Sequence, residues 1–151
     1  MYVVGLISDT HGHLDDSILD LFEGVDAIVH AGDIGGEGIL YELQAVAPVT
    51  AVRGNTDHSG PTWPLPESAS LTVGGTRIHV VHDLHSCSPT ALDEAEVLVF
   101  GHTHKPQVIR DEWQLQVNPG SASRPRSTAG LRTVALLEIR PDRVSVRIET
   151  I

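Results

Sequence analysis

Three short apolar segments open the chain, and each ends in a polar loop that contains an aspartate or an asparagine. Residues 2–8, 27–30 and 49–52 are rich in Val, Ile and Ala, which predicts buried strands. Residues 18–22 and 39–43, which lie between them, carry apolar side chains at helical spacing. This β-α-β-α-β order predicts a parallel sheet covered by helices. Ligand sites of such sheets form at the carboxyl ends of the strands, so the three polar loops are the first indication of function.

The second half of the chain is dominated by short strand pairs. We expect a short helix at residues 89–94, a buried strand at 97–100 and a loop at 118–130. Strand pairs are expected at 71–73 with 78–81, turned at Gly74-Gly75, at 108–109 with 115–117, and at 133–139 with 144–148. We therefore predict an α/β fold of two packed sheets with outer helices, antiparallel in its second half, in one domain spanning residues 1–151.

Charge and cysteine content limit the classes of partner and compartment. The 20 acidic and 10 basic residues give a net charge of −10, which argues against binding of long nucleic acid. Cys87 is the only cysteine, so no intrachain disulfide can form and a reducing compartment is expected. The sequence has neither an apolar run of about 20 residues nor a basic start typical of a signal peptide. We predict a cytoplasmic protein with no membrane contact; self-association into a homo-oligomer stays open.

Nine histidines are present, and several end apolar segments together with acidic or amide residues. Mixed oxygen and nitrogen ligands suit divalent ions such as Mn, Fe, Zn, Co or Ni. Seven ligands exceed what one such ion takes, but with one bridging carboxylate they form two four-ligand shells. Paired metals clamp the attacking and leaving oxygens of a phosphoryl displacement. The predicted metal-ligand set is Asp9, His11, Asp33, Asn55, His82, His102 and His104.

The order of these motifs resembles that of the calcineurin-like metallophosphoesterases. The motifs are Asp9-Thr10-His11, Gly32-Asp33, Gly54-Asn55-Thr56-Asp57, His82 and Gly101-His102-Thr103-His104. Two further segments and the short length are similar to the compact bacterial and archaeal phosphodiesterase branch: Val52-Arg53-Gly54-Asn55 and Asn118-Pro119-Gly120-Ser121.

The resemblance implies a fold, a set of ligand roles and an activity. The fold would be a four-layer αββα sandwich of two mixed β-sheets flanked by helices. The first metal would be held by Asp9, His11 and His104, and the second by Asn55, His82 and His102, with Asp33 bridging. The implied activity is hydrolysis of a small phosphate ester, preferably a phosphodiester, by a hydroxide that bridges two divalent metals. Manganese is the first choice, with Fe, Zn, Ni, Co or Mg as alternatives. The residues given catalytic roles are Asp33, Asn55 and His102.

Departures from the family pattern leave several roles open. Many relatives carry glycine after the histidine that matches His82, whereas this chain has Asp83 and, shortly after, His85 as a competing ligand. Thr56 stands where many relatives carry histidine, and a hydroxyl cannot protonate a leaving group efficiently. Asp57 is expected to orient a ligand or its loop. The roles of His58, Arg124 and Arg126 stay open between substrate contact and solvated loop residues.

Three rival functions remain for a chain with these motifs. One is a binding scaffold on the same fold, which a degraded metal site would favour; all seven ligand positions are intact here. Another is a phosphomonoesterase or nucleotidase, although the short chain has little room for additional substrate-binding regions. A nuclease is disfavoured by the net charge, which still allows nucleotides or cyclic nucleotides.

Overall fold

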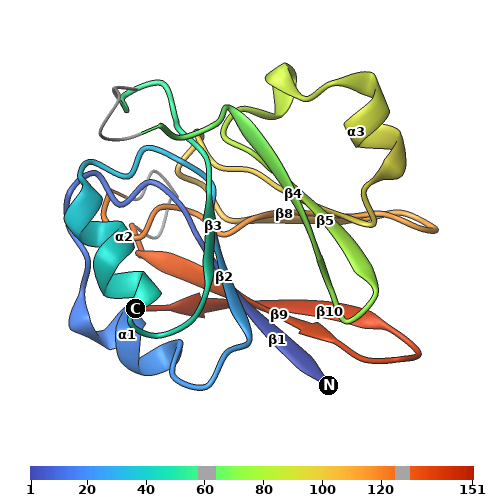
Figure 1. Ribbon diagram of the computed structural model, residues 1–151, viewed down its shortest axis with the longest axis horizontal. Coiled ribbons are helices and arrows are strands. Elements are labelled where there is room, and N and C mark those ends of the chain that lie inside the picture. Colours follow the sequence, from blue (N-terminus) through green and yellow to red (C-terminus); the bar gives the residue numbers. More distant parts are fainter. Residues whose placement is uncertain (58–63, 125–129) are drawn as a thin grey trace.

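The computed structural model describes residues 1–57, 64–124 and 130–151 and consists of two five-stranded mixed sheets packed face to face (Figure 1). The first sheet has the order β10-β9-β1-β2-β3 and the second has the order β4-β5-β6-β8-β7. The strands of the first sheet are β1 (Tyr2–Ile7), β2 (Ala27–His30), β3 (Val49–Ala51), β9 (Thr133–Ile139) and β10 (Val144–Thr150). Those of the second are β4 (Ser68–Val73), β5 (Thr76–Val81), β6 (Val97–Val99), β7 (Gln107–Arg110) and β8 (Leu115–Asn118).

Helices complete the outer layers of the sandwich. Helices α1 (Asp16–Leu21) and α2 (Glu37–Gln44) bury apolar side chains against the outer face of the first sheet, where Ile18 and Leu43 join one cluster with Ile28. Helix α3 (Pro89–Glu94) and the 3₁₀ turn η1 (Leu84–Ser86) lie beside the second sheet (Figure 1). The predicted α/β sandwich of two mixed sheets is confirmed.

Aliphatic side chains fill the space between the two sheets. Val4, Leu6 and Val29 of the first sheet are fully buried in one cluster with Val80 and Val99 of the second. Each such side chain contributes about 1.5–3 kcal/mol relative to an exposed position. With aromatic residues making up only 4% of the chain, this core depends on alternating small aliphatic residues along each strand.

The expectation of an antiparallel second half is wrong for the centre of the second sheet. Strand β6 pairs in parallel with both β5 and β8. Strand β6 runs parallel to β5 because α3 carries the chain back to the start of the sheet between these two strands. It runs parallel to β8 because the chain first forms β7 at the outer edge of the sheet and then returns as β8 between β7 and β6. The predicted turn at Gly74-Gly75 is confirmed, with φ of 54° and 81°, the left-handed conformations that a two-residue hairpin requires.

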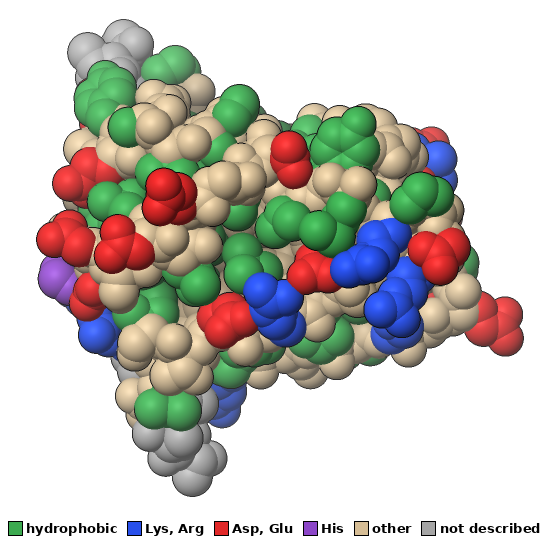
Figure 2. All heavy atoms as spheres, turned by 90° about the horizontal axis from the view of Figure 1, so that it is seen from below, with side chains coloured by type: hydrophobic (Ala, Val, Ile, Leu, Met, Phe, Trp, Pro, Cys, Tyr) green, Lys and Arg blue, Asp and Glu red, His purple; other side chains and the backbone are tan. Residues whose placement is uncertain are grey.

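The surface carries mixed charges. On the face shown in Figure 2, Lys and Arg side chains lie beside Asp and Glu side chains. On β9 and β10, Arg147 pairs with Glu138 at 2.7 Å and with Glu149 at 2.5 Å. Such exposed pairs contribute little to stability, but they neutralise basic groups that a nucleic-acid surface would need free. Among the described residues, no helix is long and apolar enough to cross a membrane.

Candidate metal centre

Strand ends from both sheets converge on one place, and the loops that follow them carry all the predicted ligands. The loops after β1 and β2 run side by side, since Asp9 N donates to Gly32 O at 3.0 Å and His11 N donates to Asp33 O at 2.9 Å. In the second sheet, Gly101 N donates to His82 O at 2.9 Å and joins the ends of β5 and β6. The structure thereby brings together the seven predicted side chains Asp9, His11, Asp33, Asn55, His82, His102 and His104.

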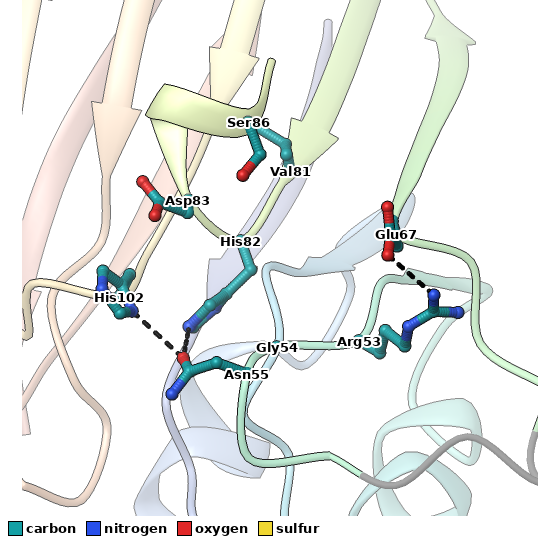
Figure 3. A pocket seen from close by; sticks show the side chains of 9 residues that line it. All are labelled: Arg53, Gly54, Asn55, Glu67, Val81, His82, Asp83, Ser86 and His102. Atoms are coloured by element: carbon teal, nitrogen blue, oxygen red, sulfur yellow. Dashed lines mark hydrogen bonds and ion pairs between the residues drawn. The ribbon is translucent and has the colours of Figure 1, made fainter. Parts of the chain in front are cut away.

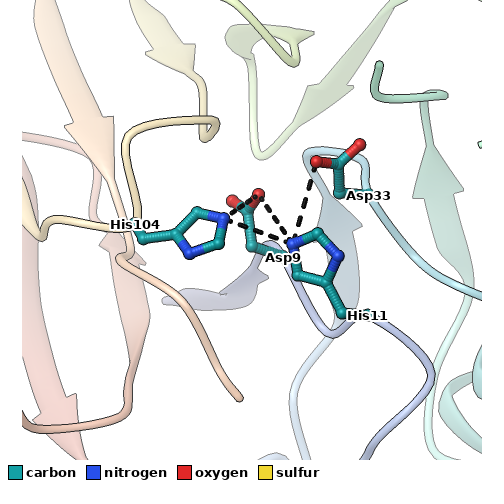
Figure 4. A group of neighbouring side chains, drawn as sticks. All are labelled: Asp9, His11, Asp33 and His104. Atoms are coloured by element: carbon teal, nitrogen blue, oxygen red, sulfur yellow. Dashed lines mark hydrogen bonds and ion pairs between the residues drawn. The ribbon is translucent and has the colours of Figure 1, made fainter. Parts of the chain in front are cut away.

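Four of these side chains form a compact group (Figure 4). Asp9, His11, Asp33 and His104 each offer a ligand atom, and these atoms all lie within 4.8 Å of one another. Asp9, Asp33 and His104 are buried, and His11 is partly buried. Two carboxylates and two imidazoles in this geometry match the donor set of a borderline divalent ion.

Asp9 presents an unpartnered oxygen to this group. Its Oδ2 atom accepts from Ser8 Oγ at 2.6 Å and from His102 N at 3.1 Å. Its Oδ1 atom is buried and has no hydrogen-bond partner among the described residues, although His104 Nε2 lies only 3.2 Å away. A buried carboxylate oxygen without a donor is costly unless a cation binds it. The residues present therefore fit a metal ion at Asp9 Oδ1.

Asp33 lies between the two parts of the centre. Its Oδ1 atom accepts from Thr56 N at 2.9 Å, whereas its Oδ2 atom lies 3.3 Å from His82 Nε2 and 3.8 Å from His11 Nε2. Burial alone would raise the pKa of Asp33, but a hydrogen bond from His82, when that ring is protonated, and one from the Thr56 backbone lower it well below its usual range. Asp33 is therefore an ionised carboxylate with one oxygen fixed by the backbone and the other facing both sets of histidines.

His82 directs a lone pair into the centre. Its Nδ1 atom lies 2.7 Å from the carbonyl oxygen of Ala31, which can only accept, so Nδ1 carries the proton of the neutral ring. Nε2 then faces two further acceptors, Asn55 Oδ1 at 3.0 Å and Asp33 Oδ2 at 3.3 Å. Burial would lower the pKa of His82, but the Asp33 and Asp9 carboxylates outweigh it and raise the pKa. The carboxylates around His82 thus stabilise a positive charge at this position, which a bound metal or a proton can supply.

His104 is oriented in the same way from the opposite side. Its Nδ1 atom donates to the carbonyl oxygen of Arg124 at 2.6 Å, which leaves the Nε2 lone pair facing Asp9 Oδ1 and His11 Nε2, both at 3.2 Å. Burial lowers the pKa of His11 despite the neighbouring carboxylates, so this ring is held neutral as a metal ligand must be. Acceptor atoms that face one another in this way are satisfied together by a cation.

Of the three remaining predicted ligands, which Figure 3 shows together, Asn55 and His102 are more open to solvent. Asn55 Oδ1 lies 3.0 Å from His82 Nε2 and 3.1 Å from His102 Nδ1. The His82 and His102 rings meet edge to face with centroids 5.1 Å apart. Asn55 and His102 are exposed, whereas His82 is buried. This part of the centre is therefore held by fewer contacts than the compact group of four.

The backbone adopts an unusual conformation at most of the predicted ligands. Among the described residues other than glycine, a positive φ occurs only at five of the seven: Asp9 (55°), His11 (46°), Asp33 (55°), His102 (73°) and His104 (62°). Aspartate and histidine tolerate the left-handed region better than most residues, but it still costs about 1–2 kcal/mol per residue. Strain of this kind persists where the surrounding structure imposes it, and it concentrates at functional sites.

Two glycines allow the carboxylates to approach the backbone. A Cβ atom on Gly54 would lie 2.0 Å from Asp33 Oδ1, and one on Gly101 would lie 2.0 Å from Ser8 Oγ and 2.7 Å from Asp9 Oδ2. Both distances are far inside van der Waals contact. Both motif positions therefore require glycine, because any Cβ atom there would clash with the Asp33 carboxylate or with the Ser8 and Asp9 side chains.

Asp57 ties two ligand loops together, as the sequence indicated. Its carboxylate accepts from Ile34 N at 2.9 Å and Gly35 N at 3.2 Å in the loop after β2, and from Gly54 N at 2.9 Å in the loop after β3. Asp33 and Asn55 belong to these same two loops. Asp57 thus fixes the separation of one carboxylate and one amide ligand without contacting the centre.

His30 supports the ligand loops in a way that its sequence position, at the end of an apolar strand, did not reveal. Gly32 N donates to His30 Nδ1 at 3.1 Å, so the ring proton is on Nε2, which lies 3.0 Å from Thr10 Oγ1. The Thr10 hydroxyl in turn donates to Ile34 O at 2.8 Å. Burial lowers the pKa of His30 to about 3, so the ring stays neutral. A neutral histidine thereby joins the loops after β1 and β2.

Several other residues that the sequence singled out lie at different places relative to the centre. His85 is exposed on η1, and within the described part of the chain its one hydrogen bond is from its backbone N–H to Asp83 Oδ1 at 3.1 Å. Arg53 pairs with Glu67 at 2.8 Å. Arg124 lines a cavity of about 360 Å³ together with His11, Asp33, Asn55, Thr56, His102 and His104. His58 and Arg126 lie outside the described residues.

Comparison with known proteins gives consistent matches along the chain. Residues 2–142 match the model of the calcineurin-like phosphoesterase superfamily domain. A probable metallophosphoesterase of Methanothermobacter thermautotrophicus is 35% identical over 140 residues, which cover 83% of this chain and 80% of that protein. The phosphodiesterase YfcE of Escherichia coli K12 is 31% identical over 148 residues, 79% of this chain and 78% of that protein.

A solved structure shares the fold at lower sequence identity. Vps29 of Entamoeba histolytica complexed with Zn²⁺ superposes with a TM-score of 0.78 at 22% identity, covering 99% of this chain and 98% of that one. At this identity the likeness concerns the fold alone.

Proposed function

The chain belongs to the calcineurin-like phosphoesterase superfamily, and from this premise we propose that it hydrolyses phosphate esters, phosphodiesters in particular, with two divalent metal ions. The observation that carries the proposal is the buried, unpartnered Asp9 Oδ1 atom at the centre of an intact ligand set. The name of the related YfcE supports the preference for diesters. A binding scaffold would have no need for these convergent acceptor atoms.

We assign the ligands by their positions around Asp33. Asp9, His11 and His104 would hold one ion, and Asn55, His82 and His102 would hold the other, with Asp33 shared. Divalent ions bound there would supply Lewis-acid activation of water and neutralise charge on the phosphoryl group. Manganese is our first choice of metal.

Arg124 is suited to contact the phosphoryl oxygens. Its backbone is fixed at both ends, since its N–H donates to Ser121 Oγ at 2.7 Å and its carbonyl accepts from His104 at 2.6 Å. The side chain lines the cavity that contains Asp33 and His11. A guanidinium offers paired donors to phosphate oxygens. Arg124 would thereby help a protein of net charge −10 to attract an anionic ester.

Because Thr56 stands where many relatives carry histidine, no imidazole at this position can protonate the leaving-group oxygen of the ester. Its N–H holds Asp33 and its side chain lines the same cavity, but a hydroxyl is a poor proton donor at neutral pH. We expect aryl phosphodiesters to react readily and alkyl esters slowly, with a steep dependence on the pKa of the leaving group. Thr56→His should flatten this dependence if the imidazole reaches the leaving oxygen.

The test is a screen of phosphate monoesters and diesters against the Mn-, Zn- and Co-loaded protein and the metal-stripped protein. Metal-dependent release of nitrophenolate from aryl diesters, faster than from the matching monoester, is the expected result. A fully loaded protein that hydrolyses no ester would instead favour the scaffold function. A monoester preference would move the assignment to the phosphomonoesterase alternative.

A further inference from the structure

A second cavity opens beside the exposed part of the metal centre (Figure 3), and Arg124 is not among the residues that line it. Its volume is about 230 Å³, and Asn55, His82 and His102 line one side of it. We propose that this cavity, which we name the alcohol subsite, binds the alcohol portion of the ester and selects an uncharged, hydroxyl-bearing alcohol over an anionic one. The inference rests on the proposed phosphodiesterase function.

The size of the alcohol subsite fits part of a substrate. Cavities that enclose whole ligands usually measure about 300–1,000 Å³, and this one is smaller. It shares Asn55 and His102 with the cavity that Arg124 lines. A phosphoryl group at the metal ligands would therefore extend one ester substituent into the alcohol subsite.

The Arg53 side chain forms a fixed and electrically balanced wall of the subsite. One guanidinium nitrogen donates to Leu65 O at 2.9 Å and another donates to Glu67 Oε1 at 2.8 Å. The Glu67 carboxylate balances the positive charge, and both side chains line the cavity. Arg53 is thus held as a rigid polar surface and its charge is already matched, which makes it a weak attractor for a second anion.

Asp83 gives the subsite its negative character. One of its carboxylate oxygens accepts from His85 N at 3.1 Å at the start of η1, and the other has no protein donor within the described part of the chain. Figure 3 places this carboxylate on the His102 side of the cavity and Ser86 near it. A carboxylate acceptor with a neighbouring hydroxyl suits the O–H groups of an alcohol and repels a carboxylate or a second phosphate.

The two cavities, which share Asn55 and His102, therefore differ in charge. Arg124 contributes a cation to one, and Asp83 contributes an anion to the other. This polarity would orient a diester with its phosphoryl oxygens toward Arg124 and its hydroxyl-bearing substituent toward Asp83. Glycerol and ribose have the size and the hydroxyl content that the alcohol subsite requires.

The experiment compares three nitrophenyl phosphodiesters whose second alcohol is glycerol, 1-propanol or 3-hydroxypropionate, so that the leaving group stays constant. In the Mn-loaded wild type we expect kcat/KM to fall in that order, with the anionic ester about tenfold below the glycerol ester. Asp83→Asn should raise kcat/KM for the anionic ester relative to that for the propyl ester. Asp93→Asn on the exposed surface of α3 changes net charge equally and serves as the control.

A binding measurement separates the inference from the proposed function. The free phosphate monoesters of glycerol and of 3-hydroxypropionate are titrated into the same Mn-loaded proteins by calorimetry, and the same order is expected. Equal kcat/KM values and equal affinities for the glycerol and anionic compounds, unchanged by Asp83→Asn, would overturn the alcohol subsite while the phosphodiesterase function stands. If no ester is hydrolysed, the proposed function fails. The alcohol subsite is then judged from calorimetry alone: tighter binding of the glycerol monoester than of the anionic monoester supports it, and equal affinities overturn it.

Discussion

On one side of Asp33, the predicted ligands Asp9 and His104 are buried, and each has a hydrogen bond to another loop, since Asp9 Oδ2 accepts from His102 N and His104 Nδ1 donates to Arg124 O. On the other side, Asn55 and His102 are exposed to solvent. We refer to the set Asp9, His11 and His104 as the buried half and to the set Asn55, His82 and His102 as the open half. Ligands that are already oriented lose less conformational entropy on binding. The buried half should therefore bind its ion first and more tightly, and the open half should be where metal and substrate exchange.

The strongest test removes the residue on which both halves depend. Asp33→Asn keeps the shape of the side chain but removes the charge that faces His11 and His82. We expect kcat/KM to fall by at least about 100-fold, because one residue serves both ions and offsets their mutual repulsion. Steady-state kinetics at saturating Mn measures this, with Asp93→Asn as a control for charge. Retention of near-wild-type activity would mean that the halves function without a shared carboxylate.

A second test asks which histidine belongs to the open half. His82→Ala removes a buried ring that faces Asn55, whereas His85→Ala removes an exposed ring on η1. We expect a loss of about 10–100-fold in metal affinity or activity for the first and less than about threefold for the second. Equilibrium dialysis with Mn and an aryl diester assay report the two effects. If His85→Ala has the larger effect, His85 is the ligand and replaces His82 in the open half.

The third test measures the difference between the halves directly. Calorimetric titration of the metal-stripped protein with Mn should give two ions per chain in separate steps, with affinities about tenfold or more apart. Asn55→Ala should weaken only the weaker step, and Asp9→Asn should weaken the tighter one. Two steps of equal affinity would remove the distinction, and a stoichiometry of no more than one ion would end the two-metal assignment.

The smallest expected effect concerns the support of the buried half. The pKa of His30 falls from about 6.5 in the unfolded chain to about 3 in the fold because burial disfavours the charged ring. Between these values the unfolded chain binds more protons, so acidification below pH 6.5 lowers the free energy of unfolding, by at most about 1.4 kcal/mol per pH unit from this residue. His30→Asn retains an acceptor for Gly32 N and cannot titrate.

Guanidinium denaturation of the metal-free proteins between pH 5 and 8 checks this contribution. We expect His30→Asn to be less stable at pH 8 by about 1–3 kcal/mol, because its contact with Thr10 is lost, but to show a shallower decline toward pH 5. If the free energy of unfolding falls equally steeply toward pH 5 in the wild type and in His30→Asn, the fold does not hold His30 neutral.

Sequence reasoning identified the strands, and the side chains that it predicted as ligands come together in the structure, because both depend on local pattern. Short apolar runs that end in Asp33 or Asn55 identify strand ends, and strand ends of a sheet meet at one edge. Pairing in the second sheet could not be predicted this way, since the parallel contact of β6 with β8 depends on β7 taking the edge. The unpartnered Asp9 Oδ1 and the His30 contacts are likewise tertiary, because they join residues from separate loops.

The left-handed backbone at five predicted ligands lowers the stability of the chain that keeps this centre. Glycine at any of these positions would relieve about 1–2 kcal/mol of steric strain against about 0.5–1 kcal/mol for its greater freedom in the unfolded chain. At an exposed position such as His102, the metal-free protein would then gain stability as it lost a predicted ligand. A lineage with no use for the metals would drift toward such replacements, since most chains retain only the stability they need. Five strained residues among the seven predicted ligands are what we expect of a chain that keeps a metal centre at the expense of stability.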